Sequence, residues 1–306
     1  MRTLARLVAL AALLAGAAPV AASSDPALQR AMDGLLAADR QHATAAAAVD
    51  VVTALTAMFA DDVIMPAAPG RFYRGIAEAR EALRANPDNL DGRVAWTPVG
   101  GGIAADGQQG YTFGFMNVTT TAGTTPLKYM AYWARRAEGW RVVGYKRARR
   151  PEGDVKLTLM PLRVPAASRP VDADAARLDA HRRSLADAEK AFSDEAQRIG
   201  LGPAFAKHGA DTAVNMGGPS SAGYVVGAAA IAATVGAGAP GATSPVEWST
   251  ETAIVASSGD LGISFGFIRP NARAADAAAA APPPPAPFFT IWHRPSPTAA
   301  WEYIAE

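Results

Sequence analysis

The sequence contains no cysteine and few histidines, and these absences exclude several kinds of site. Without cysteine the chain has no disulfide, no lipoprotein anchor, no thiolate metal ligand and no cysteine nucleophile. The four histidines show no metal-ligand spacing such as H-E-x-x-H. We therefore expect no metal site, and no motif in the sequence calls for a cofactor.

An excess of charge of either sign is also missing. The chain has 29 Lys and Arg against 28 Asp and Glu, a formal charge of +1. Removal of Arg2 and Arg6 with a leader segment gives 27 − 28 = −1. A nearly neutral chain has no global electrostatic reason to bind nucleic acid or an anionic membrane, so we expect neither partner.

The hydrophobic run at the N-terminus is too short to span a membrane. Arg2 and Arg6 precede the apolar residues 7–18, and Val20, Ala21 and Ala22 form a small-residue cleavage site. This order is typical of a secretory signal peptide over residues 1–22, cut after Ala22. We expect a periplasmic or secreted protein without membrane insertion; an uncleaved N-terminal anchor is the alternative.

The chain repeats itself at a domain-sized interval. Three anchor residues of the first half recur in the second half with a constant offset of 152, namely Gly75, Trp96 and Gly114 against Gly227, Trp248 and Gly266. A period of this size indicates two copies of one domain. We place the first domain at residues 25–150, a linker at 151–172 and the second domain at 173–306, with a Pro- and Ala-rich insertion at 271–287.

Each copy shows helical periodicity first and strand alternation afterwards. In the first copy, helices over residues 25–60 precede a short strand at 63–65 and a short helix at 76–83. Period-two patterns then predict antiparallel strands at 93–99, 109–119, 128–136 and 140–147. One further strand is possible in the linker at 156–160. This order predicts an α+β fold in both copies.

Several short motifs accompany this order. Phe59-Ala60-Asp61-Asp62 precedes the first strand, Gly75 opens the short helix, and Gly139-Trp140-Arg141-Val142-Val143 closes the domain. With them the first copy resembles the NTF2-like superfamily, and in particular its SnoaL-like and DUF4440 types. The second copy resembles it more weakly.

The resemblance implies a strongly curved antiparallel sheet wrapped into a cone, with helices closing one end of a cavity. Members often pair sheet against sheet as dimers, so two copies in one chain are expected to pair with each other and leave a monomer. Some members are isomerases, dehydratases or hydrolases that use an Asp with a His or Tyr. In this chain that role would fall to Asp62 with Tyr73 or Tyr129, although Asp61 and Asp62 stand at a helix-to-strand corner that favours a turn role.

The first copy is rich in aromatic residues and offers no carboxylate on the strand positions expected to face inside. Its candidate ligand-binding residues are Tyr73, Trp96, Tyr111, Phe113, Tyr129 and Trp133. They either fill the core or line a cavity for a small apolar or aromatic molecule. The second copy offers Trp248, Phe265, Phe267, Phe289 and Ile291. We therefore expect the first cone to be the better candidate for binding, and the second to be mainly structural.

Three functions remain open from the sequence. The first is a non-catalytic protein that binds a small ligand or acts as an interaction module. The second is the Asp-dependent enzyme described above, and the third is a structural protein whose cones are filled by their own side chains. Gly236–Gly241 matches G-x-G-x-x-G but follows an Ala-rich helix rather than a strand, so we interpret it as a loop.

Overall fold

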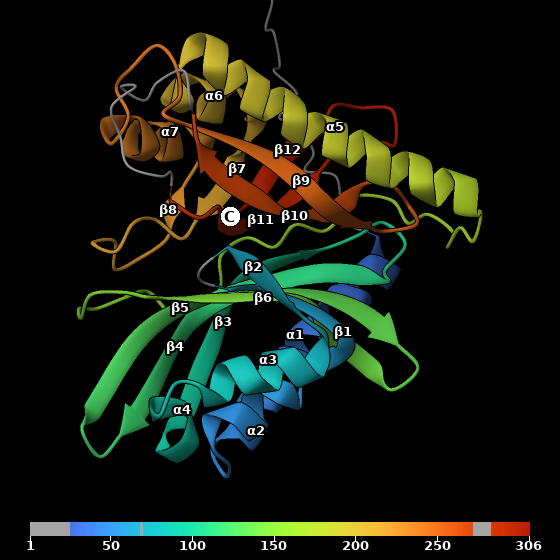
Figure 1. The fold of residues 1–306 in the computed structure, drawn as a ribbon. Coiled ribbons are helices and arrows are strands. Elements are labelled where there is room, and N and C mark those ends of the chain that lie inside the picture. The colour runs from blue at the N-terminus through green and yellow to red at the C-terminus, as the bar shows by residue number, and fades with distance from the viewer. Residues whose placement is uncertain (1–24, 68–69, 272–282) are drawn as a thin grey trace, which may run out of the picture.

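The computed structural model describes residues 25–67, 70–271 and 283–306, which form two α+β domains joined by a linker. Figure 1 shows the domains stacked with their sheets facing each other, while the helices of each domain cover the outer side of its sheet. The predicted signal peptide and most of the Pro- and Ala-rich insertion lie outside the described residues. None of the described helices is long and apolar enough to cross a membrane.

The first domain begins with helices and ends with four long strands. Its elements are α1 (Pro26–Ala46), α2 (Val51–Thr56), β1 (Phe59–Ala67), β2 (Arg71–Arg74), α3 (Gly75–Arg84), α4 (Asp88–Asp91), β3 (Arg93–Ile103), β4 (Gln109–Thr120), β5 (Gly123–Arg136) and β6 (Gly139–Arg149). The strands form one sheet in the order β2-β1-β6-β5-β4-β3. The β1–β6 pair is parallel and the others are antiparallel, so the sheet is mixed.

The second domain repeats this plan. Its elements are α5 (Ala175–Ile199), α6 (Leu201–His208), β7 (Gly209–Asn215), β8 (Val225–Val226), α7 (Ala228–Ala237), β9 (Val246–Val255), β10 (Leu261–Pro270), β11 (Ala286–His293) and β12 (Glu302–Ala305). The sheet order β8-β7-β12-β11-β10-β9 matches that of the first domain strand for strand. The structure therefore confirms the predicted α+β class and the predicted tandem arrangement of two similar domains.

The repeated glycines are explained by backbone geometry. Gly75 and Gly227 start α3 and α7 with φ of 82° and 94°, a region that disfavours side chains. A Cβ on Gly114 would lie 2.1 Å from the Thr97 carbonyl oxygen, and one on Gly266 would lie 2.0 Å from that of Ser249. The glycine anchors thus mark a helix start with positive φ and a position where each sheet leaves no room for a Cβ.

Two expectations about local structure are wrong. Asp61 and Asp62 lie inside β1 rather than at a corner, because strand pairing already begins at Phe59. Residues 156–160 form no strand. Instead, linker backbone bonds to the edge of β3, from Met160 N–H to the Val99 carbonyl at 2.8 Å and from Arg163 N–H to that of Gly101 at 3.0 Å.

The two sheets pack against each other through apolar side chains and close backbone. Phe72 of β2 contacts Phe265 and Phe267 of β10, with ring centroids 5.9 and 5.1 Å apart. Gly144 of β6 faces Ile263 and Phe265 so closely that a Cβ would lie 2.9 Å from the Ile263 Cδ1. Because both faces of each sheet are covered, the strands carry apolar residues on both sides.

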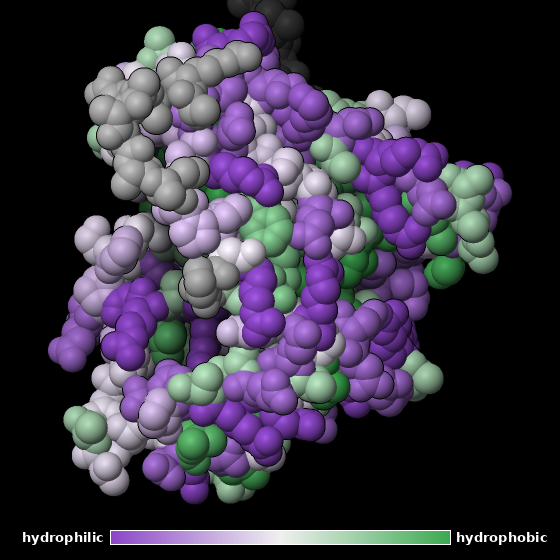
Figure 2. Space-filling view, viewed as in Figure 1, coloured by the Kyte–Doolittle hydropathy of each residue, from purple (hydrophilic) through white to green (hydrophobic). Residues whose placement is uncertain are grey.

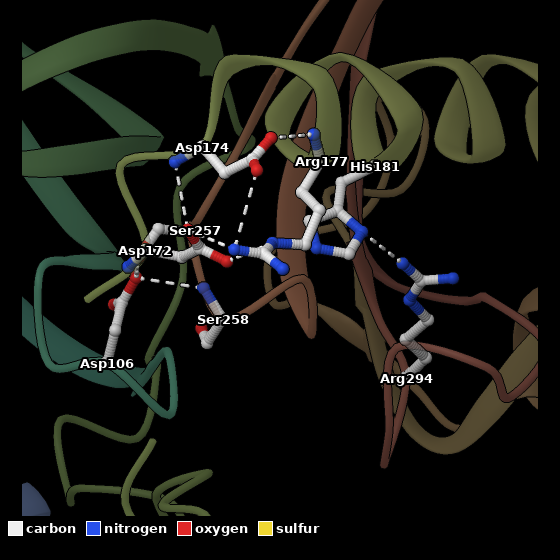
Figure 3. Close-up of polar contacts among 8 residues, drawn as sticks. All are labelled: Asp106, Asp172, Asp174, Arg177, His181, Ser257, Ser258 and Arg294. Atoms are coloured by element: carbon white, nitrogen blue, oxygen red, sulfur yellow. Dashed lines mark hydrogen bonds and ion pairs between the residues drawn. The ribbon is translucent and has the colours of Figure 1, made fainter. Parts of the chain in front are cut away.

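Hydrogen bonds between the β3–β4 and β9–β10 turns reinforce the pairing. Asp106 accepts hydrogen bonds from the Ser257 hydroxyl at 2.8 Å and the Ser258 N–H at 3.2 Å (Figure 3). In return, Asp260 accepts one from the Ala105 N–H at 3.0 Å. The exchange is nearly reciprocal, since residues 105 and 106 correspond to 257 and 258 at the offset of 152.

A second set of bonds ties a loop of the second domain to the first. The buried ammonium of Lys128 donates to the carbonyls of Met216, Ser221 and Gly223. The Tyr224 hydroxyl lies 2.7 Å from the carbonyl oxygen of Tyr129. The domains therefore share polar as well as apolar contacts.

Candidate functional site

We call the region between the helices and the sheet of each domain its cone, and each cone contains a carboxylate that is almost completely buried. In the first cone this is Asp39 of α1, which accepts hydrogen bonds from the Trp96 indole at 2.6 Å and the Tyr129 hydroxyl at 2.9 Å. Burial raises the pKa of Asp39, while its hydrogen-bond donors oppose that shift. Nearby, the Trp133 indole donates to the Thr112 hydroxyl at 2.9 Å.

In the second cone the equivalent carboxylate is Glu189 of α5. It accepts hydrogen bonds from the Trp248 indole at 2.7 Å, the Ser264 hydroxyl at 2.5 Å and the Trp292 indole at 3.1 Å. Burial raises the pKa of Glu189 to about 7 despite these donors. In both cones a helix carboxylate is thus hydrogen-bonded to indole and hydroxyl groups of three neighbouring strands.

Asp39 and Glu189 are not among the residues predicted from the sequence, because both lie on helices and not on the strand positions expected to face inside. Asp39 follows Leu28, Met32 and Leu35 on the apolar face of its helix, and Glu189 stands between Leu185 and Phe192 at helical spacing. An acidic residue within an apolar stripe is the signal that would have found them, since such a residue is rarely buried without partners.

A cavity of about 250 Å³ opens beside Glu189 in the second cone. Its wall is mostly apolar and draws on α5, α6, α7 and the concave side of the sheet. The residues that line it are Glu189, Phe192, Leu201, Phe205, Val235, Val246, Trp248, Ile268, Phe288, Thr290 and Glu306. Two acidic residues therefore face an otherwise largely apolar space.

The Glu306 side chain is less completely hydrogen-bonded than that of Glu189. Its backbone continues the pairing beside β7, through bonds with Val214 and Met216, and so fixes the side chain at the cavity. Its Oε2 atom is buried and has no hydrogen-bond partner among the described residues. Burial raises the pKa of Glu306 to about 7, an effect that Lys146 of the first domain opposes.

Lys146 reaches the second domain from the face of β6 that lies between the domains. Its ammonium donates to the Phe289 carbonyl at 3.2 Å and lies 4.3 Å from the centre of the Phe289 ring. Burial lowers the pKa of Lys146 to about 8. The electrostatics of the second cone therefore include a charge supplied by the first domain.

The aromatic residues predicted to bind a ligand lie on different sides of the first sheet. Trp96, Tyr129 and Trp133 are buried in the core of the first cone, where they take part in the polar contacts described above. Tyr111 and Phe113 lie on the opposite face, where the Phe113 ring packs 4.9 Å from that of Tyr224 in the second domain.

Tyr73 and Asp62 lie at the margin of the first domain. Tyr73 is half-buried, with the Arg71 guanidinium 4.7 Å from the centre of its ring. The Asp62 side chain is 65% exposed and forms an ion pair with Arg136 at 2.9 Å. Asp62 therefore lacks the buried position that the Asp-dependent reaction requires of it, and the Tyr129 hydroxyl binds Asp39 instead.

The side of each strand that faces a cone differs from our expectation in the second copy as well. Phe265 contacts Phe72 of the first domain, and the Phe289 ring lies against the Lys146 ammonium of that domain. Both residues therefore lie on the face between the domains. Phe288 and Thr290, one residue away on β11, are the ones that line the cavity. The second cone, which we expected to be mainly structural, contains the cavity described here.

Comparison with known proteins finds solved structures that are similar to parts of this chain at low sequence identity. No protein-family model and no curated protein matches the sequence. A protein of unknown function with a cystatin-like fold from Nostoc punctiforme is similar at 13% identity, over 39% of this chain and 90% of its own, with a TM-score of 0.31. An NTF2-like protein with a cystatin-like fold from Novosphingobium aromaticivorans is 14% identical over 40% of this chain and 84% of its own, with a TM-score of 0.29.

A third solved structure is that of a ketosteroid isomerase-like protein from Erwinia carotovora atroseptica. It is 14% identical over 40% of this chain and 92% of its own, with a TM-score of 0.27. Each of these matches covers about the length of one domain. The architecture of the present chain follows from its own strand order, and its function has to be argued from its own residues.

Proposed function

We propose that the second domain binds a small, largely apolar molecule that carries a cationic amine. The observation behind this proposal is the cavity of about 250 Å³ with the buried Oε2 of Glu306 at its wall, an atom for which the described part of the chain offers no hydrogen-bond partner. A buried carboxylate without a partner is costly, and a bound ammonium group would satisfy it. Binding without chemistry is the function that this arrangement supports best.

The chemistry of the wall defines the ligand class. Glu189 already accepts three hydrogen bonds from the protein, so it contributes negative charge more than a free acceptor. Glu306 supplies the free acceptor, while Phe192, Trp248 and Phe288 supply aromatic surface. Aromatic rings and carboxylates together favour an organic cation over an anion.

The volume of the cavity limits the size of the ligand. Pockets for drug-sized molecules measure roughly 300–1,000 Å³, and about 250 Å³ lies below that range. A single aromatic ring with a short amine side chain has the appropriate size. We therefore choose 2-phenylethylamine as the probe and 2-phenylethanol, which has the same shape without the charge, as its neutral counterpart.

Isothermal titration calorimetry with these two compounds tests the proposal. We expect 2-phenylethylamine to bind about tenfold or more tightly than 2-phenylethanol, because a charge-assisted hydrogen bond is stronger than a neutral one. Ile268→Trp, which places a larger side chain on the cavity wall, should abolish binding of the amine. Leu90→Trp, at an exposed position of the first domain, is the matched control and should leave it unchanged.

Two outcomes would contradict the proposal. One is equal affinity for the amine and the alcohol, and the other is undiminished amine binding by a folded Ile268→Trp variant.

We further propose that the mature protein is exported after cleavage behind Ala22 and acts as a monomer, as the leader sequence and the contacts between the two domains suggest.

A further inference from the structure

A second hollow lies between the two domains, beside the linker. Two cavities of about 440 and about 400 Å³ adjoin there and have Met160 and Val226 in common. Their walls come from β3 and β4 of the first domain, from the loop before β8 and strands β7, β8 and β12 of the second, and from linker residues 154–164. We call this space the linker groove. It is separate from the cavity of the second cone.

The linker groove offers apolar surface that the fold leaves uncovered. Leu159 and Val226 are 41% and 46% exposed, and both line the groove. Deeper in the wall, the rings of Tyr111 and Phe113 are stacked, with centroids 6.4 Å apart. The face in Figure 2 is mostly hydrophilic, with apolar residues scattered between polar ones. Exposed apolar side chains gathered in a hollow mark a binding site.

One end of the linker groove carries a positive charge that neutral groups hold in place. The Arg163 guanidinium donates to the Thr212 hydroxyl at 2.6 Å and lies 3.5 Å from the His293 Nδ1. Burial lowers the pKa of His293 most, and the positive charges of Arg163 and Arg169 lower it further, to about 4. This imidazole is therefore uncharged at neutral pH.

The groups around Arg163 leave its charge available to a ligand. Its described hydrogen-bond partners are a hydroxyl and a neutral ring, and the hydroxyl of Tyr111 also interacts with it. At the other end of the groove, Asp154 and Lys156 contribute one charge of each sign. A planar guanidinium of this kind matches the geometry of a carboxylate, which it can bind through two parallel hydrogen bonds.

We propose that the linker groove is a second binding site, one that takes a small carboxylic acid with an aromatic or aliphatic body. The carboxylate binds Arg163, and the apolar body lies along Tyr111, Phe113 and Met160. This site prefers an anion, whereas the cavity of the second cone prefers a cation. The two assignments are therefore independent, and each is tested with its own probe.

Calorimetry with 1-naphthylacetate and its neutral amide, 1-naphthylacetamide, tests the proposal on the whole chain. We expect the acid to bind about tenfold or more tightly than the amide. Arg163→Met should remove this preference, and Arg163→Lys should keep part of it because the charge remains. Arg30→Gln, which removes an exposed charge of α1, is the matched control and should bind the acid like the wild type.

The methyl resonances of ¹³C-labelled methionine locate the bound probe. The Met160 signal, assigned with Met160→Leu, should shift on addition of 1-naphthylacetate, whereas that of Met32, which is buried in the first cone, should not. Ile268→Trp should leave this binding intact, which separates it from the second cone. Equal affinity for acid and amide, an unmoved Met160 signal, or an acid preference that survives in Arg163→Met would overturn the assignment.

Discussion

Asp39 and Glu189 occupy equivalent places although their types differ and their offset is 150 rather than 152 (189 − 39). Each bonds to a strand tryptophan of the repeat, Trp96 in one cone and Trp248 in the other. A second helix-facing pair, Thr112 with Trp133, has its counterpart in Ser264 with Trp292. A buried carboxylate stabilises a fold only when such partners are complete, so the repeated arrangement explains why both tryptophans recur.

The raised pKa of Glu189 predicts how stability depends on pH. The carboxyl has a pKa of about 7 in the folded protein against 4.5 ordinarily. Between these values the folded chain binds more protons than the unfolded one, so the free energy of unfolding should fall as pH rises from about 4.5 to about 7. The contribution of one such group is on the order of 3 kcal/mol.

Urea denaturation of Glu189→Gln at several pH values tests this prediction. The variant should show a flatter pH profile over that interval because the titrating group is gone. Its absolute stability should also drop, since the glutamine amide cannot accept every hydrogen bond that the carboxylate accepts. Glu302→Gln, on the exposed side of β12, is the control. A profile for Glu189→Gln as steep as that of the wild type would contradict the assigned shift.

At the level of secondary structure, one sheet packs closely on the other at Gly144. A side chain there would meet Ile263 and Phe265 of the second domain. We expect Gly144→Leu to reduce the free energy of unfolding by about 1–3 kcal/mol, the usual penalty for overpacking. Gly218→Leu, at a glycine with open space around it and no positive φ, should change stability by less than about 0.5 kcal/mol.

Denaturant titration followed by circular dichroism compares the two glycine variants. A Gly144→Leu protein as stable as the wild type would show that the sheets are not in close contact at this point. The same experiment on the Gly218→Leu variant reports any general effect of a leucine in place of glycine. The difference between the two variants is therefore the quantity of interest.

The strands show which part of the structure the sequence could predict. Alternation along residues 109–119 and 128–136 correctly separates Tyr111 and Phe113 from Thr112, and Tyr129 and Trp133 from Met130. It does not say which set faces the cone, because the second domain buries the other face as well. For this reason the prediction that Phe265 and Phe289 face the second cone is wrong.

At the scale of the whole molecule, the sequence predicts the two-domain organisation better than it predicts the binding site. A fixed offset between glycines and tryptophans suffices to predict two copies, since each anchor has a local cause in backbone geometry or in a buried hydrogen bond. The site depends on contacts that join distant segments. Glu306, at the end of the second sheet, and Lys146, from the first domain, influence each other across the interface, and no local pattern reports this.

The affinity of 2-phenylethylamine for Glu306→Gln, compared with that for wild type and Glu302→Gln, tests the central claim most directly. The wild type and Glu302→Gln should bind the amine alike, and more tightly at pH 8 than at pH 6, because Glu306, with a pKa of about 7, loses its charge as pH falls. Glu306→Gln should bind about tenfold more weakly and show a smaller pH dependence, because only Glu189, whose pKa is also about 7, still titrates at the cavity. Wild-type affinity and pH dependence in Glu306→Gln would contradict the account.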